Sequence, residues 1–514
     1  MLAAIRSAAV VGVDAVPITV EVNAASGLPG WTMVGLPSGA VREARDRVAA
    51  ALTNAGFTLP PRRWTVNLSP ADVRKEGPGF DLPIAIGVLV ASGQLAPEAV
   101  EGRWFLGELG LDGQVRAVRG TLPFAQAARR GGARLAVIPE GNAAEAALLR
   151  ELPVACAASF AGLVDALRRG RLVPQGSRVP PPPTDPAVVD ALDLADVAGQ
   201  RTAKRALELA AAGGHNLLML GPPGAGKTML ARRLAGLLPP LEDAAFLDVV
   251  ALHSVGGLLP AGVTPSRRPP FRAPHHTVSL PGLIGGGPGP RPGEVSLAHR
   301  GVLFLDELPE FQRGALEALR QPLESGRAVV ARANAHASYP ARVQLVAACN
   351  PCRCGHIADP SRACGRAPRC GRDYLARLSG PLIDRIDMQV ELAPVPPQAL
   401  AAAPAAEPSA AVAARVARAR ERAAARGAAL GLAPDRAASN ALLDGRALEQ
   451  AAQLDDPARA LLARASERLK LSARGYHRVL RVARTLADLD GSARLGRAHV
   501  GEALAYRRSP GLEA

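Results

Sequence analysis

The residues with the clearest chemistry lie in the segment 215–228, whose sequence is HNLLMLGPPGAGKT. A short apolar run is followed by Gly221-x4-Gly226-Lys227-Thr228, and the apolar segment MLARRLAGLL continues from there. Glycines at this spacing let backbone N–H groups surround a phosphate, the lysine reaches the β/γ-phosphates and the threonine hydroxyl ligates Mg²⁺. We therefore predict a P-loop that binds ATP and Mg²⁺. Its nucleotide-contacting residues would be Gly221, Pro222, Pro223, Gly224, Ala225, Gly226, Lys227, Thr228 and Met229.

A second apolar run, GVLFL, ends in two carboxylates, Asp306 and Glu307. An apolar strand followed by Asp-Glu is common by itself, but after a P-loop it is typical of a Walker B motif. Asp306 would then hold the Mg²⁺ shell together with Thr228. Glu307 would polarise the attacking water as a general base.

Five of the six cysteines fall within residues 349–370. Such clustering outside a secreted protein favours a metal site over disulfides. The set Cys352-x-Cys354-x9-Cys364-x5-Cys370 offers four thiolates, enough for tetrahedral Zn²⁺. The alternative is a loop of reduced thiols, because the C-x-C spacing is less usual than C-x2-C. Cys349 lies in an apolar run and is expected to pack in the core.

The composition favours a polyanionic partner only modestly. The 514 residues carry a net charge of +15 with a pI near 10.5, and arginine supplies nearly all of the positive charge. An Ala/Arg/Gly-rich composition that reflects genomic base bias would give the same excess of positive charge. No apolar run approaches the roughly 18 residues of a membrane helix, and Asp14 interrupts any signal-like segment. We expect a cytoplasmic protein with no membrane partner.

The chain divides into several regions around these motifs, and its fold class is predicted as α/β and multidomain. Residues 1–170 alternate short apolar runs with helical stretches, and 171–192 form a proline-rich linker, because four consecutive prolines exclude helix and sheet. Residues 193–396 would form the P-loop core. Residues 397–514, with repeated Ala/Arg patterns, would form a helical domain.

Between the two nucleotide motifs the chain is too rich in Gly and Pro for a simple crossover helix, so we expect an insertion that projects from the core. Its Arg267, Arg268, Arg272, His275 and His276 form a cationic cluster, which indicates either a substrate-contacting loop or a solvated loop. After Asp306 we expect a helix over 312–324. Two β-rich segments, 328–332 and 341–348, should then form a hairpin with Arg332 and His336 near its tip.

Several segments resemble one known family. NLSPADVRKEGPGFDLPIAIGVL, FRAPHH, PGEVSLAHRGVLFLDELPEF, LSGPLIDRID and LSARGYHR are similar to the magnesium-chelatase-like AAA+ ATPases of the YifB/ComM family, and the resemblance covers almost the whole chain. It implies a Lon-protease-like N-terminal domain, an AAA+ core with a helix-2 insert and a C-terminal helical lid. Gly79 stands where a Lon-type protease has its serine, and the helix beginning near Thr121 has no lysine. The N-terminal domain is therefore expected to be a structural or binding module.

The resemblance also implies roles for single residues. Asn350 would be the polar sensor, Arg385 an arginine finger acting on a neighbouring subunit, and Arg474 the second-sensor arginine of the lid. For Arg385 an intrachain pair with Asp384 is the alternative. Arg478 and Arg481 compete with Arg474. Gln200 would either border the adenine or cap a helix, and Arg353 departs from the proline common in the family's cysteine segment.

At the level of the whole protein, the resemblance implies a homohexamer that binds single-stranded or branched DNA. Such a motor would have helicase activity and drive branch migration when transforming DNA is integrated. The residues themselves indicate only an ATPase. A remodelling ATPase that does not move along DNA is the alternative.

Overall fold

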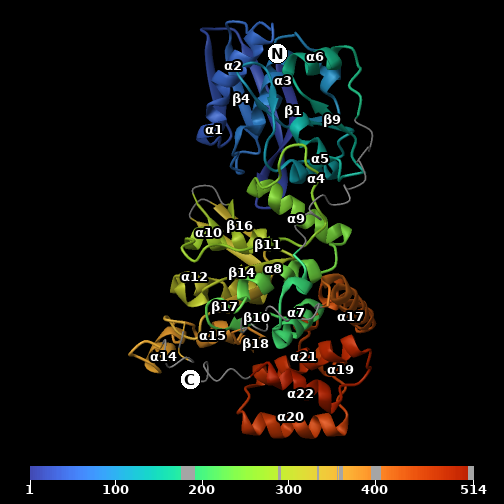
Figure 1. The fold of residues 1–514 in the computed structure, drawn as a ribbon. Coiled ribbons are helices and arrows are strands. Elements are labelled where there is room, and N and C mark those ends of the chain that lie inside the picture. Colours follow the sequence, from blue (N-terminus) through green and yellow to red (C-terminus); the bar gives the residue numbers. More distant parts are fainter. Residues whose placement is uncertain are drawn as a thin grey trace.

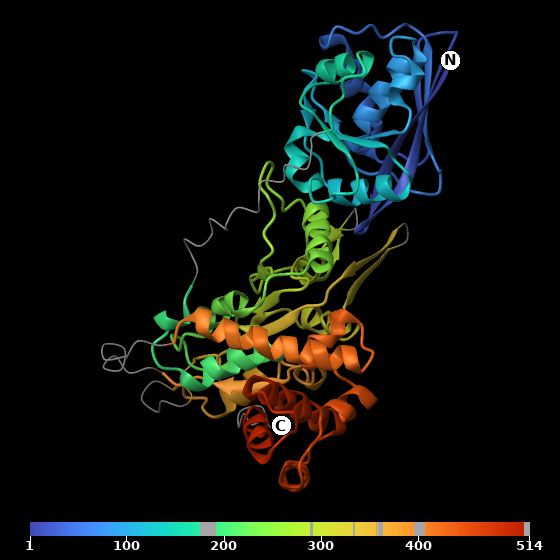
Figure 2. The same ribbon diagram turned by 90° about the vertical axis from the view of Figure 1, so that its right-hand side faces the viewer.

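The computed structural model describes residues 1–174, 192–287, 291–332, 335–355, 357, 363–394 and 407–507. Most of the proline-rich segment expected at 171–192 lies outside these residues. The molecule is elongated, with an N-terminal α/β unit at one end, the P-loop core in the middle and a group of helices at the other end (Figures 1 and 2). The expected multidomain α/β architecture with helical C-terminal residues is confirmed.

The N-terminal unit is built on a seven-stranded mixed sheet in the order β3-β4-β2-β1-β5-β8-β9. Helix α3 (Asp81–Ala91) is buried at every position and packs on β1 and β2, as its continuous apolar sequence requires. The strands are β1 (Leu2–Val11), β2 (Asp14–Ala25), β3 (Gly30–Val34), β4 (Arg63–Ser69), β5 (Arg103–Phe105), β8 (Leu135–Pro139) and β9 (Val154–Ala157). Other helices of the unit are α2 (Ala44–Asn54), α4 (Thr121–Arg130), α5 (Ala143–Ala146) and α6 (Phe160–Arg168).

The core contains a five-stranded parallel sheet in the order β11-β14-β17-β10-β18. Its central strands are buried at every residue, which suits a parallel sheet covered on both faces. The strands are β11 (Phe271–Arg272), β14 (Val302–Leu305), β17 (Gln344–Cys349), β10 (Leu217–Leu220) and β18 (Met388–Glu391). Because all five are parallel, the residues that follow β10, β14 and β17 meet at one edge of the sheet.

Two expected elements of the core differ from the structure. The helix expected over 312–324 is divided into α12 (Arg313–Ala318) and α13 (Arg320–Ser325), and Pro322 lies in the first turn of α13, where the missing N–H is tolerated. The hairpin pairs β15 (Arg327–Arg332) with β16 (Ala335–Pro340), whereas the residues expected to form its second strand belong largely to β17.

The C-terminal helices pack against the flank of the core. Helix α7 (Arg201–Gly213) shares one apolar cluster with α17 (Ser409–Ala429) and α21 (Ala473–Asp490). His215 Nε2, just before β10, lies 2.8 Å from the Thr485 hydroxyl of α21, which ties the helices to the amino ends of the core strands. The remaining helices include α18 (Pro434–Ala437), α19 (Gly445–Ala451), α20 (Asp456–Arg468) and α22 (Arg497–Ala505).

The N-terminal unit is docked on the core through α9 (Asp243–Gly256), which lies between the two in Figure 1. Apolar residues of α9 share one cluster with α4, and the Gly120 N–H donates to the Ser254 hydroxyl at 2.9 Å. Val13, in the turn between β1 and β2, packs against Tyr339 of the β15–β16 hairpin. That hairpin extends toward the N-terminal unit in Figure 2. The hairpin body is therefore in contact with another part of the same chain.

Within the described parts of the chain, no helix combines the length and apolar character needed to cross a bilayer.

Candidate active site

The P-loop connects β10 to helix α8 (Lys227–Leu237). Gly224 and Gly226 have φ values of 78° and 89°, in the left-handed region that only glycine adopts readily. The Lys227 ammonium group donates to the backbone oxygens of Gly221 at 2.6 Å and Pro222 at 2.9 Å. The loop thus curls around its own lysine at the amino end of α8, the geometry that suits a phosphate group.

Three strands contribute side chains to this edge of the sheet. Lys227 also donates to Asn350 Oδ1 at 3.0 Å, which links the P-loop to the end of β17. The Thr228 hydroxyl donates to Asp306 Oδ2 at 2.6 Å, which links α8 to the end of β14. The structure therefore brings together Lys227, Thr228, Asp306 and Asn350, which are far apart in the sequence.

Charge and burial set the character of this cluster. Burial lowers the pKa of the Lys227 ammonium group, and the nearby carboxylate of Asp306 opposes that shift. Lys227 is 8% exposed, whereas the Glu307 side chain is about half exposed. Glu307 has a φ of 53°, and its N–H donates to Asp306 Oδ1 at 3.0 Å. Glu307 thus has a left-handed backbone conformation that is uncommon outside glycine, and its carboxylate is accessible to solvent.

His276 also belongs to this edge, which the sequence analysis did not anticipate. Its Nδ1 lies 3.4 Å from Glu307 Oε2, and its ring is 4.1 Å from the ring of His275, centroid to centroid. The histidines were interpreted as part of a projecting cationic loop. However, β11 pairs in parallel with β14, so residues that follow β11 reach the same edge as those that follow β14. The short segment Phe271–Arg272, which forms a strand just before the histidines, was the sequence feature that could have indicated their position.

Gln200 does not cap α7 through its side chain, whereas its expected contact with adenine stays a prediction. It occupies the position before α7 with a φ of 49°, but its side chain makes no capping bond to that helix. Its Nε2 instead donates to the backbone oxygens of Ala225 at 3.1 Å and Ala393 at 2.7 Å. Gln200 therefore joins the P-loop to the segment that follows β18.

The cysteines expected to bind metal lie together beside the P-loop. The sulfurs of Cys352, Cys354 and Cys370 lie within 4.8 Å of one another, and the first two are 3.2 Å apart. Cys364, the fourth expected ligand, is not one of these three, although burial and a hydrogen bond with Cys364 raise the pKa of Cys370 to about 12. Cys349 is 1% exposed within β17, as expected of a core residue.

The cysteine segment also touches the nucleotide loop. A Cβ atom on Gly355 would lie 2.6 Å from Pro223 Cδ, so the two backbones approach closely at this point. The cysteine cluster is thus positioned to influence the shape of the P-loop.

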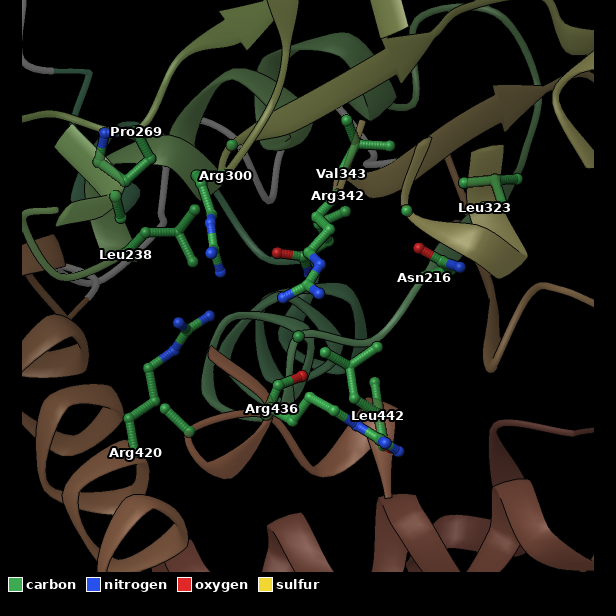
Figure 3. Close-up of a pocket in the computed structure, with 18 of the residues that line it drawn as sticks. Asn216, Leu238, Pro269, Arg300, Leu323, Arg342, Val343, Arg420, Arg436 and Leu442 are labelled. Carbon is green, nitrogen blue, oxygen red and sulfur yellow. The ribbon is translucent and has the colours of Figure 1, made fainter. Parts of the chain in front are cut away.

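Arg385 and Arg474 lie elsewhere. Both line a cavity of about 1030 Å³ at the amino ends of the core strands (Figure 3). A four-residue strand such as β10 spans roughly 13 Å, so this cavity and the P-loop are on opposite edges of the sheet. Arg385 forms an ion pair with Glu324, and Arg474 is exposed at the start of α21. The structure does not bring either arginine to the P-loop of its own chain.

The two arginines that compete with Arg474 lie on the same face of α21. Arg478 is buried, with its Nε 3.7 Å from Asp387 Oδ1 and its Nη1 3.8 Å from Asp384 Oδ1. Arg481 Nε donates to the Leu443 backbone oxygen at 2.6 Å. The intrachain partner expected for Arg385, Asp384, is therefore close to Arg478 instead, because Arg385 extends to Glu324 of α13.

The cationic cluster expected to project from the core is largely held within it. Arg272 belongs to β11 and forms a bidentate pair with Glu294, with both contacts at 2.7 Å. Arg267 forms an ion pair with Asp243 and lies 4.8 Å above the Phe246 ring. The expectation that Arg272 lies in a projecting segment is wrong, because β11 places it in the core sheet. Arg267 is paired, but its side chain remains 41% exposed. The side chains of Arg332 and His336 lie outside the described residues.

Sequence comparisons extend this description. The family model "Magnesium chelatase, subunit ChlI" matches residues 193–400, and models of the same subunit's N-terminal and C-terminal parts match 20–142 and 406–507. "Competence protein ComM" of Haemophilus influenzae is 45% identical over 513 residues, covering 98% of this chain and 97% of the relative. The YifB protein of Escherichia coli is 44% identical over 522 residues, with the same coverage.

A more distant match is limited to part of the chain. The "Magnesium-chelatase 38 kDa subunit" of Rhodobacter capsulatus is 29% identical over 173 residues, covering 30% of this chain and 49% of that subunit. Of these three relatives, ComM and YifB match nearly the full length of this chain. Together with the P-loop core and the helical C-terminal residues, these matches show that the chain belongs to the YifB/ComM family of magnesium-chelatase-like AAA+ ATPases.

Proposed function

We propose that this protein hydrolyses ATP at the edge of the core sheet where β10, β14 and β17 end. The observation that carries the proposal is the pair of bonds from adjacent P-loop residues, Lys227 to Asn350 and Thr228 to Asp306. These bonds bring the phosphate-binding loop, a metal-binding carboxylate and a polar sensor into one place. Such an arrangement suits phosphoryl transfer, in which catalysis depends mainly on positioning and charge stabilisation.

Each residue has a distinct role in this proposal. The backbone N–H groups of 224–229 and the Lys227 ammonium group bind the phosphates. Lys227 exchanges its present backbone acceptors for phosphate oxygens. Thr228 and Asp306 provide oxygen ligands for Mg²⁺, which supplies positive charge to the phosphate chain when bound. Glu307 accepts the proton of the attacking water, and Asn350 orients that water or the γ-phosphate.

Two variants separate binding from hydrolysis. Lys227→Ala should abolish ATP binding, because it removes the phosphate-binding ammonium group. Glu307→Gln should keep ATP affinity and slow hydrolysis by at least roughly a hundredfold, the usual effect of losing a general base. Nucleotide affinity by equilibrium titration and steady-state hydrolysis provide the two readouts. Hydrolysis by Glu307→Gln at the wild-type rate would assign the base to another residue.

We also propose that the protein works as a ring, with six subunits as the expected number. Support comes from the position of Arg385 and Arg474, which share a cavity at the edge of the sheet opposite the P-loop. If these arginines act on ATP, the nucleotide must be held by a neighbouring subunit. Arg385 would then exchange its ion pair with Glu324 for the γ-phosphate of that neighbour.

The proposed use of the hydrolysis energy is movement of single-stranded or branched DNA, including branch migration during transformation. The net charge of +15 and full-length similarity to a relative named a competence protein support this proposal. Arg267 and Arg272 are less suitable DNA contacts than expected, since both are engaged by carboxylates. The alternative remains a remodelling ATPase that acts on another substrate. DNA-dependent stimulation of hydrolysis distinguishes the two.

The N-terminal unit is proposed to be a Lon-like but non-proteolytic module. A Cβ atom on Gly79 would lie 2.9 Å from Leu106 Cδ1, so a serine side chain would be crowded at this position. Lys75 is fully buried, and its ammonium group donates to the Pro70 backbone oxygen. Helix α4 contains no lysine. A serine–lysine dyad therefore has neither of its members available at these positions.

For the cysteine cluster we propose a structural Zn²⁺ bound by Cys352, Cys354, Cys364 and Cys370. The close approach of the first, second and fourth sulfurs supports this proposal. Four thiolates form the ligand set typical of a closed, structural zinc site.

A further inference from the structure

The cavity at the amino ends of the core strands has a second feature besides Arg385 and Arg474. It lies at the seam between the core and the C-terminal helices, and six more arginines line it, four of which are labelled in Figure 3. Arg300 and Arg342 precede β14 and β17 of the core, while Arg420 and Arg436 belong to α17 and α18. We call these four residues the seam arginines.

Figure 3 shows how these side chains are directed. The side chains of Arg300 and Arg420 extend toward each other from the core and from α17, and the Arg342 guanidinium group lies in the space beside them. Arg436 lies below them on α18, and its guanidinium group extends away from the other three and donates to the Leu442 backbone oxygen at 3.1 Å. Side chains from two separate parts of the fold therefore direct positive charge into one space.

The cavity is also lined by carboxylates that neutralise part of this charge, namely Glu242, Glu324, Asp384, Asp387, Glu421 and Asp444. Arg436 pairs with Asp444 at 2.9 Å, but Arg300 and Arg420 form no ion pair within the described ranges. Arg420 Nε donates to the Ala211 backbone oxygen at 2.8 Å, and Arg300 Nε is buried with no hydrogen-bond partner among the described residues. Buried guanidinium donors that remain unsatisfied are costly, so a bound anion would stabilise the site.

The pKa shifts agree with this picture. Burial lowers the pKa of Arg420 to about 10, and no carboxylate opposes the shift. Burial also lowers the pKa of Arg342, and the charges of Arg300 and Arg436 lower it further. Asp248 interacts electrostatically with Arg300 and Arg342, yet it does not line the cavity. The positive charges of Arg300 and Arg436 therefore repel that of Arg342.

We propose that the seam arginines bind a small anion that carries a chain of two or three phosphate groups, at a site separate from the P-loop. Guanidinium groups match phosphate oxygens with paired donors, and several phosphates are needed to reach arginines on both sides of the seam. A cavity of about 1030 Å³ is large enough for such a chain. Because two of the arginines belong to the core and two to the C-terminal helices, the anion would hold these parts together.

The test uses full-length protein with Lys227→Ala, so that the P-loop does not contribute. Tripolyphosphate is titrated by calorimetry at low and moderate salt. We expect one anion per chain, with an affinity that falls as salt rises. Arg300→Gln and Arg420→Gln, added separately, should each weaken binding by about tenfold or more, the usual effect of losing a charge-assisted hydrogen bond. The Arg420→Lys variant should lose less affinity for tripolyphosphate than the Arg420→Gln variant.

The matched control is Arg464→Gln, which removes an exposed arginine on α20 that does not line the cavity. It should leave the affinity unchanged. Circular dichroism confirms that each variant is folded. If only one of Arg300→Gln and Arg420→Gln folds, that variant alone suffices for the comparison with Arg464→Gln. No binding of tripolyphosphate at low salt, or equal affinity in the seam variants and the control, would overturn the proposal.

A second arm distinguishes a free phosphate chain from phosphates carried by a larger molecule. A single-stranded oligonucleotide and an ATP-loaded copy of the Glu307→Gln protein are added in place of tripolyphosphate. Binding of tripolyphosphate by the Lys227→Ala protein alone supports the free anion. Binding that depends on the seam arginines but occurs only with the oligonucleotide or the loaded copy would contradict it.

Discussion

Lys227 shows how much of the site a short motif determines. The spacing of glycine, lysine and threonine predicted a phosphate-binding loop, and the observed loop has the left-handed glycines and the enclosed ammonium group that this spacing requires. The bond from Lys227 to Asn350 was not predictable from spacing, because it depends on β17 lying beside β10. His276 was assigned to the wrong surface for the same reason. Its position depends on β11 joining the sheet.

His276 provides the prediction at this scale. Its Nδ1 lies 3.4 Å from Glu307 Oε2, so it should orient the base rather than bind ATP. His276→Ala should lower kcat by roughly tenfold, less than the loss of a general base itself, while the KM for ATP stays nearly constant. His275→Ala is the matched control, because its ring stacks on His276 and is not paired with Glu307. A rise in KM with no change in kcat would exclude the orienting role.

Among the elements, long patterned segments were easier to predict than their boundaries. The apolar run before the P-loop forms the strand β10, because burial of every residue leaves a clear signal. The segment 312–324 became two helices, and 335–340 became a strand. The strand at 335–340 depends on pairing with β15, and local composition does not reveal this pairing.

The cysteine segment gives a prediction at the element scale. Purified protein should carry close to one zinc per chain, and replacing Cys352 and Cys354 with Ser should remove it. Because Gly355 packs against Pro223, loss of zinc should also weaken ATP binding. Cys156→Ser is the control, since Cys156 lies in β9 of the N-terminal unit and should affect neither property. Metal-free protein in an elemental analysis made before any chelation would refute the zinc proposal.

At the scale of the whole molecule, the C-terminal helices pack at the amino ends of the core strands, opposite the P-loop. The sequence indicated these helices but not the side of the sheet they cover. That side depends on contacts such as His215 with Thr485, between residues far apart in the chain. In a ring, the face that carries Arg385 and Arg474 would meet the P-loop face of the next subunit. The site would be complete only after assembly.

Mixing two inactive variants tests this arrangement. Arg385→Ala should stop hydrolysis while ATP affinity is retained, and Lys227→Ala should not bind ATP. When the two are assembled together, some interfaces combine an intact P-loop with an intact arginine, so partial activity should return. Co-assembly is confirmed by differential tagging. Continued inactivity of mixed assemblies would indicate that Arg385 acts within its own chain, as its pairing with Glu324 also allows.

ATP hydrolysis at the P-loop edge is proposed to drive work on DNA. The most direct test is the steady-state hydrolysis rate of the full-length protein at low salt, measured alone, with single-stranded DNA and with a branched junction. Glu307→Gln is measured in parallel to assign the activity to this site. We predict measurable hydrolysis that both DNAs increase in the wild type, and almost none in the variant. Hydrolysis that depends on Glu307 but does not respond to either DNA would contradict the DNA-motor account and favour a remodelling ATPase.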